Sequence, residues 1–171
     1  GLGHVLALVL EKWARREPRS AAEFTRQLPA AVRERALLEA VAGWAERDAT
    51  AAAAWIAELP SGDDQNRAAR KLASDWARQE STAAARWVDQ LPPGPAKNEA
   101  ITGLVATIFA THPDDAIVWT RALPDPAARR DLLKRYWSNW KERDPAKAEA
   151  WLSSTRELTP GERADLERPA R

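Results

Sequence analysis

Few side chains in this sequence are of a type and spacing that could do chemistry. Cysteine is absent, which excludes disulfides, thiolate metal sites and cysteine nucleophiles. The two histidines, His4 and His112, have no second ligand at metal-binding spacing, and neither is placed to act as the base of a hydrolase triad. We therefore expect a protein that is not an enzyme and that binds no metal and no cofactor.

Two pairs of adjacent carboxylates are the other residues that could hold a cation. Asp63-Asp64 and Asp114-Asp115 each lie where a helix is predicted to begin, and carboxylates there complement the positive end of the helix dipole. We interpret both pairs in this way, with a cation site as the alternative. His112 lies at a predicted turn, which indicates a turn or capping role, with ligation or catalysis as the alternative.

The elements that would position these residues are indicated by a recurring aromatic pair. The two members of each pair are always eleven residues apart, and a Leu-Pro dipeptide follows in the first four units, whereas the fifth has Thr155-Arg156. Spacing of this regularity predicts tandem repeats of about 32 residues. The pairs are Trp13 and Phe24, Trp44 and Trp55, Trp76 and Trp87, Ile108 and Trp119, and Trp140 and Trp151.

Each unit is predicted to be two helices joined by a tight turn. Apolar residues precede the first aromatic by eight, seven, four and three positions, which is one stripe of an α-helix. Pro18, Pro113 and Pro145 suit the first position of a second helix, and Asp48 and Asp144 suit its N-cap. The predicted pairs are 3–16 with 18–28, 32–47 with 49–59, 64–79 with 81–91, 96–111 with 113–123, and 126–143 with 145–154.

The predicted fold is all-α, a right-handed α-solenoid of five helix-turn-helix repeats of about 32 residues over 1–156, plus a short C-terminal helix. One hairpin cannot bury both of its apolar stripes, so neighbouring hairpins must stack, with the tryptophans packed between them. The run Thr159-Pro160-Gly161-Glu162 predicts the start of the last helix. Residues 157–171 are either a capping helix or the start of a further repeat.

The pattern resembles the tetratricopeptide-type α-solenoids in the small-then-aromatic spacing of Ala51 to Trp55 and Ala83 to Trp87, although the period here is 32 residues and theirs is 34. It is more similar to uncharacterised bacterial proteins with tandem units of Trp-Ala-x-x-Asp-Pro followed by Ala-Ala-x-x-Trp and Leu-Pro. Trp44-Ala45, Asp144-Pro145 and Ala84 to Trp87 carry that similarity. The resemblance implies a fold and a binding role, and it implies no catalytic residue.

The function that we expect is a non-enzymatic scaffold that binds a peptide or a domain of a partner protein. The basic residues of two predicted helices could meet an acidic peptide, with an ordinary solvated helix surface as the alternative. Trp137 adds a second large aromatic next to Trp140, so we expect aromatic surface to be exposed there. The predicted binding residues are Arg67, Arg70 and Lys71 on one helix and Arg130, Lys134, Arg135 and Trp137 on the other.

Other functions stay open as alternatives. Helix 3–16 is apolar on nearly all sides, which favours self-association through it or contact with repeats that precede it in a longer product. The absence of Met, including at position 1, indicates a processed or excised piece. A net charge of +1 gives no reason to expect a nucleic-acid partner, although a helical repeat that binds nucleic acid is a further alternative. No apolar run is long enough to span a membrane, so we expect a soluble protein. The resemblance to bacterial proteins implies the bacterial cytoplasm or periplasm, and the sequence leaves the compartment open.

Overall fold

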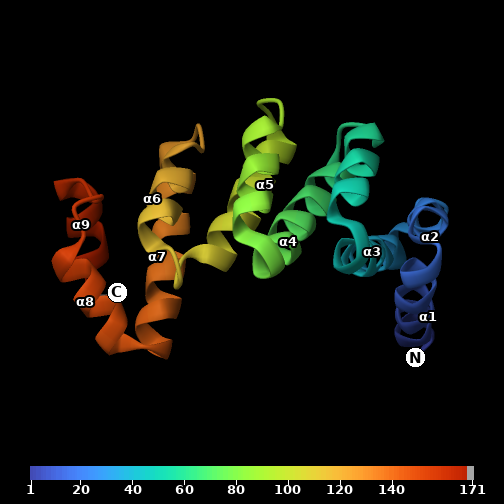
Figure 1. Cartoon of the computed structure of the whole chain (residues 1–171), viewed down its shortest axis with the longest axis horizontal. Coiled ribbons are helices and arrows are strands. Elements are labelled where there is room, and N and C mark those ends of the chain that lie inside the picture. Colours follow the sequence, from blue (N-terminus) through green and yellow to red (C-terminus); the bar gives the residue numbers. More distant parts are fainter. Residues whose placement is uncertain (169–171) are drawn as a thin grey trace. The chain divides into compact units, whose positions relative to one another are not determined.

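The computed structural model describes residues 1–168 and is all-helical over that range (Figure 1), which confirms the predicted all-α class. The described chain contains nine helices and no strand. The helices are α1 Leu2–Arg16, α2 Pro18–Thr25, α3 Ala30–Glu58, α4 Asp63–Gln90, α5 Pro95–Ile108, α6 Pro113–Arg121, α7 Pro126–Arg143, α8 Pro145–Ser154 and α9 Pro160–Glu167.

None of these helices combines the length and the apolar character that a bilayer crossing requires, as far as the described chain extends. The end of the predicted segment 157–171, residues 169–171, lies outside the described residues.

The predicted turns between paired helices are present, in two forms. Where a proline follows the turn, as at Pro18, Pro113 and Pro145, a new helix begins on the proline. Where no proline follows, two helices join end to end across a kink, so α3 and α4 each combine two predicted helices. The backbone of α3 leaves the helical region at Asp48 (φ −156°, ψ 84°), and that of α4 leaves it at Glu80 (φ −152°, ψ 83°).

Two of the predicted capping residues make the expected hydrogen bonds. A carboxylate oxygen of Asp48 accepts from the amide of Ala51 at 2.9 Å, and one of Asp144 accepts from the amide of Lys147 at 3.2 Å. Each bond satisfies one of the first amides of a helix, which have no partner inside the helix.

The aromatic pairs meet within their hairpins. Ring centroids lie 5.5 Å apart for Trp13 and Phe24, 5.9 Å for Trp44 and Trp55, 6.0 Å for Trp76 and Trp87, and 5.6 Å for Trp140 and Trp151. Next to Ile108, which takes the aromatic position of the fourth pair, Phe109 is 2% exposed and packs on Tyr136, Trp140 and Trp151. The aromatic contacts are therefore extended by a residue that the sequence pattern did not single out.

A second contact recurs where one hairpin ends and the next helix begins. The last carbonyls of a helix have no intrahelical partner, and a long polar side chain from the first turns of the following helix donates to them. Gln65 donates to the carbonyls of Ile56 and Leu59, Lys97 to those of Asp89 and Leu91, Arg129 to that of Leu123, and Arg163 to those of Leu152 and Thr155.

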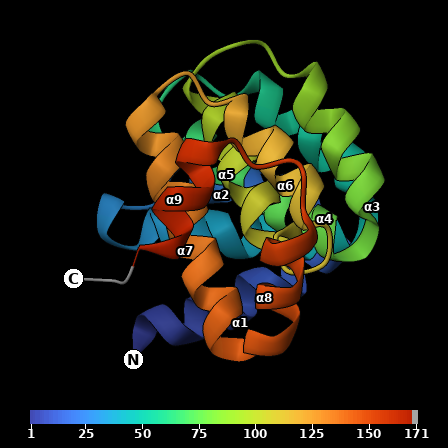
Figure 2. The same ribbon diagram turned by 90° about the vertical axis from the view of Figure 1, so that its left-hand side faces the viewer.

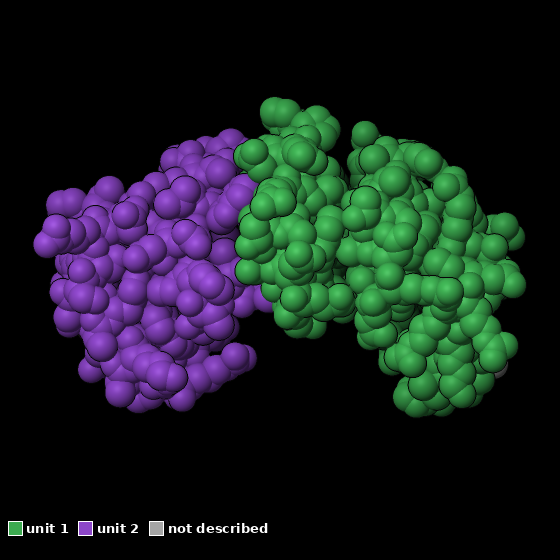
Figure 3. Space-filling view, viewed as in Figure 1, with its two compact units in different colours: residues 1–103 green, residues 104–171 purple. Residues whose placement is uncertain are grey.

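The chain divides into two compact units, Gly1–Gly103 and Leu104–Arg171, which Figure 3 shows in green and purple. In the first unit, α3 packs against α1, α2 and α4, around a core that includes Leu10, Val41 and Leu72. In the second unit, α7 contacts α6, α8 and α9 (Figure 2), and its core contains Trp137 and Trp140.

Candidate interaction surfaces

The predicted basic residues of α4 lie on the helix surface, but each has an acidic partner. Arg67 Nε is 3.4 Å from Glu34 of α3, Arg70 Nη1 is 3.4 Å from Glu99 of α5, and Lys71 Nζ is 3.2 Å from Asp75 within α4. The first two pairs link neighbouring helices of the first unit. Much of the positive charge expected on this surface is therefore neutralised by carboxylates of the same chain.

Asp75 is a polar feature of α4 that the sequence analysis missed. Its side chain is only 10% exposed, and one carboxylate oxygen accepts from both Lys71 and Arg78, each at 3.2 Å. The other oxygen, Oδ2, is buried without a hydrogen-bond partner. Asp75 directly precedes Trp76, just as Gly43 precedes Trp44, so the sequence pattern favoured no carboxylate at this position. A buried acceptor without a partner is uncommon and costs stability.

The basic residues of α7 differ from those of α4, because two of them are not paired. Arg130 Nε lies 3.6 Å from Asp165 of α9. Lys134 is half-buried and Arg135 is exposed, and neither side chain has an ion pair or hydrogen bond within the described chain. The two predicted basic clusters belong to different compact units, α4 to the first and α7 to the second.

The expectation that Trp137 exposes aromatic surface is wrong. Trp137 is 4% exposed, and its ring centroid lies 5.9 Å from that of Trp151 and 6.4 Å from that of Trp140. The Lys141 ammonium group sits 5.9 Å from the same ring. Trp137 is buried because Trp151 of α8 packs against it.

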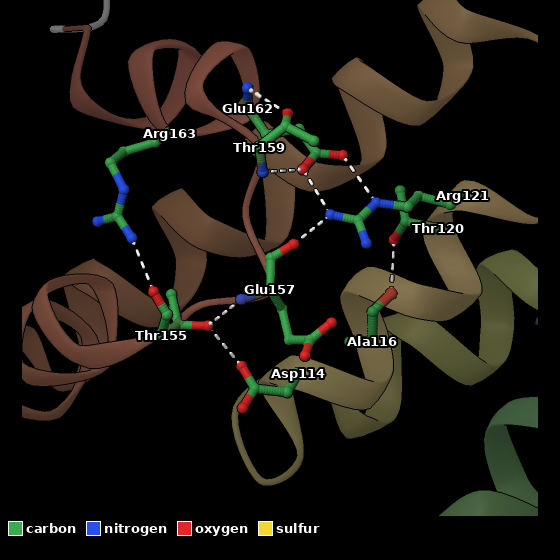
Figure 4. Close-up of polar contacts among 9 residues, drawn as sticks. All are labelled: Asp114, Ala116, Thr120, Arg121, Thr155, Glu157, Thr159, Glu162 and Arg163. Atoms are coloured by element: carbon green, nitrogen blue, oxygen red, sulfur yellow. Dashed lines mark hydrogen bonds and ion pairs between the residues drawn. The ribbon is translucent and has the colours of Figure 1, made fainter.

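A shallow cleft in the second unit lies between α6, α7 and α9 and has a volume of about 190 Å³. Arg121 of α6 and Glu162 of α9 form a two-pronged ion pair on its wall, with Nε to Oε1 at 3.1 Å and Nη2 to Oε2 at 2.7 Å (Figure 4). Arg121 also donates to the carbonyl of Glu157. The cleft is lined by Thr120, Arg121, Pro126, Arg129, Arg130, Leu133, Glu162 and Asp165.

The ionisation of this pair is shifted by its own hydrogen bonds. The Arg121 guanidinium holds the pKa of the Glu162 carboxyl below its ordinary value, against an opposing effect of burial. The bond to Glu162 in turn raises the pKa of Arg121 above its ordinary value. Both groups stay charged through the physiological range, so the cleft keeps a closed ion pair and not a free arginine.

Residues 155–162, which lead into α9, make further polar contacts (Figure 4). Thr159 and Glu162 form a capping box, with the Thr159 amide 2.8 Å from Glu162 Oε2 and the Glu162 amide 3.2 Å from Thr159 Oγ1. The Asp114 carboxylate accepts from Trp151 Nε1 at 2.8 Å and from the Thr155 hydroxyl at 2.7 Å. One carboxylate thus joins the start of α6 to the end of α8.

The carboxylate pairs and His112 lie where the sequence placed them. Both pairs stand in the first turn of a helix, α4 or α6, and Asp64 also lies 3.4 Å from Arg33. His112 is the residue before α6, and its side chain makes no capping bond, whereas its Nδ1 lies 3.0 Å from the Thr111 hydroxyl. Among the residues that the structure describes, no three metal-binding side chains gather in one place.

A comparison of the chain with protein-family models, with curated proteins and with solved structures finds no match.

Proposed function

We propose that the chain is a right-handed α-solenoid of five helix-turn-helix repeats and works as a non-enzymatic scaffold that binds an acidic peptide segment of a partner protein. The bound segment would lie on the surface of α7 that carries Lys134 and Arg135. Stacked hairpins of this kind offer an extended surface for a peptide.

Two recurring contacts support the repeat organisation. Aromatic pairs with the same sequence spacing meet at 5.5 to 6.0 Å in four hairpins. The donation from Gln65, Lys97, Arg129 and Arg163 to preceding carbonyls recurs at four junctions between hairpins. A contact made by equivalent positions of successive units is what a repeat protein requires.

One observation carries the binding role. Arg67, Arg70, Lys71 and Arg130 all have carboxylate partners, while Lys134 and Arg135, adjacent on α7, have none within the described chain. Unpaired cations on a helix surface attract an acidic segment, and they need not give up an internal ion pair to bind it.

The test is binding of fluorescently labelled peptides of 15 residues, one set rich in Asp and Glu and one in which Lys replaces them. We expect the acidic set to bind and the double variant Lys134→Glu/Arg135→Glu to weaken that binding by about tenfold or more. Fluorescence anisotropy at fixed ionic strength measures the dissociation constants.

A double variant with the same change in net charge distinguishes the effect of the α7 surface on binding from the effect of net charge. Arg86→Glu/Arg156→Glu changes two exposed arginines that likewise have no ion pair within the described chain. We expect it to change the binding by less than about twofold. An equal loss in both double variants, or no binding of any acidic peptide, would contradict the proposed function.

A further inference from the structure

The helix α9 is an acidic segment that packs on basic helices of the second unit. It contains three carboxylates and one arginine, whereas α7 contains six basic residues and two carboxylates. Two of the α9 carboxylates face these helices. Glu162 lies 2.7 Å from Arg121 of α6, and Asp165 lies 3.6 Å from Arg130 of α7. One acidic helix of the chain itself is thus already bound to α7, the helix proposed to bind a second one.

Arg130 and Lys134 form a basic stripe on α7, because residues four apart lie on the same side of a helix. Asp165 neutralises Arg130, and Lys134 has no ion pair within the described chain. The carboxylates of α9 therefore reach the first cation of the basic stripe and stop short of the second.

The contact of α4 with α5 shows what meets the position of Lys134 in another unit. Arg70 of α4 is equivalent to Lys134, since each stands six residues before the first aromatic of its unit. Arg70 Nη1 lies 3.4 Å from Glu99 of α5. In the first unit, a carboxylate of the following helix therefore pairs with the cation at this position.

Asp165 of α9 is the counterpart of Glu99 in α5. Each stands two residues after the side chain that donates to the carbonyls at the end of the preceding hairpin, Lys97 before Glu99 and Arg163 before Asp165. α9 therefore occupies the place of the following helix beside α7. An acidic helix that paired with Lys134 as Glu99 pairs with Arg70 would need the same place.

We propose that α9 is an intramolecular occupant of the basic stripe, and that an acidic helix of the partner protein binds Arg130, Lys134 and Arg135 by displacing it. The inference rests on the proposed function and adds the regulation of that site. The partner helix would resemble α9, with two carboxylates three residues apart, like Glu162 and Asp165. The apparent affinity for this partner is then reduced to the fraction of molecules in which α9 is detached.

The contacts that hold α9 are of a kind that a partner can replace. Leu166 is the buried residue of this helix, at 4% exposed, so little apolar area keeps it in place. The ion pair of Asp165 is open to water, because the Arg130 side chain is 58% exposed, and such pairs contribute little. The stronger contact is the two-pronged pair of Glu162 with Arg121. An acidic partner supplies carboxylates for both arginines.

The first test measures binding of the acidic 15-residue peptides to the wild-type chain and to the double variant Glu162→Gln/Asp165→Asn. This variant removes both ion pairs of α9 and leaves the basic stripe unchanged. We expect its dissociation constant to be lower than that of the wild type by about fivefold or more.

The control is Glu157→Gln/Glu167→Gln, which changes the net charge by the same amount. Neither of these carboxylates has an ion pair within the described chain. Its dissociation constant should stay within about twofold of the wild-type value. Circular dichroism checks that both double variants stay helical. Equal dissociation constants for the wild type and Glu162→Gln/Asp165→Asn would overturn the inference.

Hydrogen exchange in the wild-type chain provides a test that needs no variant. With acidic peptide at saturation, we expect exchange in residues 163–167 to accelerate by about fivefold or more, while exchange in α7 slows. Unchanged or slower exchange in α9 would show that the peptide binds beside it and would overturn the inference, although the proposed function would stand. Failure of the acidic peptides to bind either protein would contradict both.

Discussion

In the second unit, the side chain of Glu162 connects two helices, α6 and α9. Glu162 accepts two hydrogen bonds from Arg121 of α6 and one from the Thr159 amide at the start of its own helix. The same carboxylate therefore caps α9 and attaches it to α6. Such charge-assisted, two-pronged bonds are stronger than single neutral ones.

We expect Glu162→Gln to lower the free energy of unfolding at pH 7 by about 1–2 kcal/mol, a modest loss because both side chains are partly exposed. The pKa of Glu162 is lowered in the folded protein from an ordinary value of 4.5. Its stabilisation is therefore complete above about pH 4.5 and is lost as the pH falls through the lower folded value. Urea unfolding of both proteins between about pH 3 and pH 7 measures the difference.

The control for this prediction is Glu157→Gln, which removes a nearby carboxylate but keeps the backbone carbonyl that Arg121 binds. Its effect should stay within about 0.5 kcal/mol. A gap between wild type and Glu162→Gln that grows as the pH falls would contradict the assigned role of the carboxylate.

Local features of single residues could be predicted from the sequence, and long-range ones could not. Asp48 and Asp144 were predicted as caps because the amide that a cap binds lies only three residues away. Asp114 accepts from Trp151 and Thr155, 37 and 41 residues along the chain, and no local spacing indicates such partners. The smaller residues at the equivalent position of the other units favour an exposed location for Trp137. The sequence did not show that Trp151 would cover it.

At the scale of elements, the prolines and the apolar spacing were sufficient to place the helices within a few residues. The long helices α3 and α4 each consist of two predicted helices that meet at a kink, at Asp48 and at Glu80. Their turns lack a proline, so the amide that a proline would remove is still present and no new helix has to begin there. The packing of α9 on α6 and α7 could not be predicted from the sequence either. It depends on Arg121 and Arg130, which lie more than thirty residues earlier in the chain.

The close approach of α4 and α5 depends on one glycine. A Cβ on Gly103 would overlap the Arg70 carbonyl oxygen and would lie 3.2 Å from the carbonyl carbon. Because backbone atoms cannot move aside as a flexible side chain can, we expect Gly103→Ala to lower the free energy of unfolding by about 1–3 kcal/mol. Thermal or urea unfolding followed by circular dichroism measures the loss.

Gly3→Ala is the matched control, since Gly3 is also helical but a Cβ there meets no atom within 4 Å. Alanine is a better helix former than glycine, so this change should be neutral or stabilising by up to about 1 kcal/mol. If Gly103→Ala were as stable as Gly3→Ala, the tight contact between α4 and α5 would be disproved.

On the scale of the whole molecule, each of the two compact units has its own buried tryptophans, Trp44 and Trp55 in the first and Trp137 and Trp140 in the second. We expect Trp140→Ala to destabilise the second unit by about 3–5 kcal/mol, because a large buried ring leaves a cavity. Hydrogen exchange should therefore accelerate in α7 and α8 by far more than in α3. The measurement is exchange at peptide resolution in the absence of denaturant.

Trp44→Ala provides the reciprocal case in the first unit, where Trp44 is buried to a similar degree. Exchange should then accelerate mainly in α1 and α3. Equal acceleration throughout the chain in either variant would show that the two units unfold only together.

The ion pairs between neighbouring helices also bear on how similar hairpins find the right order. Glu34 and Arg130 both stand ten residues before the tryptophan of their helix, yet Glu34 meets Arg67 of α4 and Arg130 meets Asp165 of α9. The polarity of the pair is thus reversed between the two junctions. Exchange of α4 and α9 would set Arg67 against Arg130 and Asp165 against Glu34. Because α3 also pairs Arg33 with Asp64 of α4, the junction of α3 with α4 carries both polarities, and its exposed ion pairs favour that neighbour only weakly.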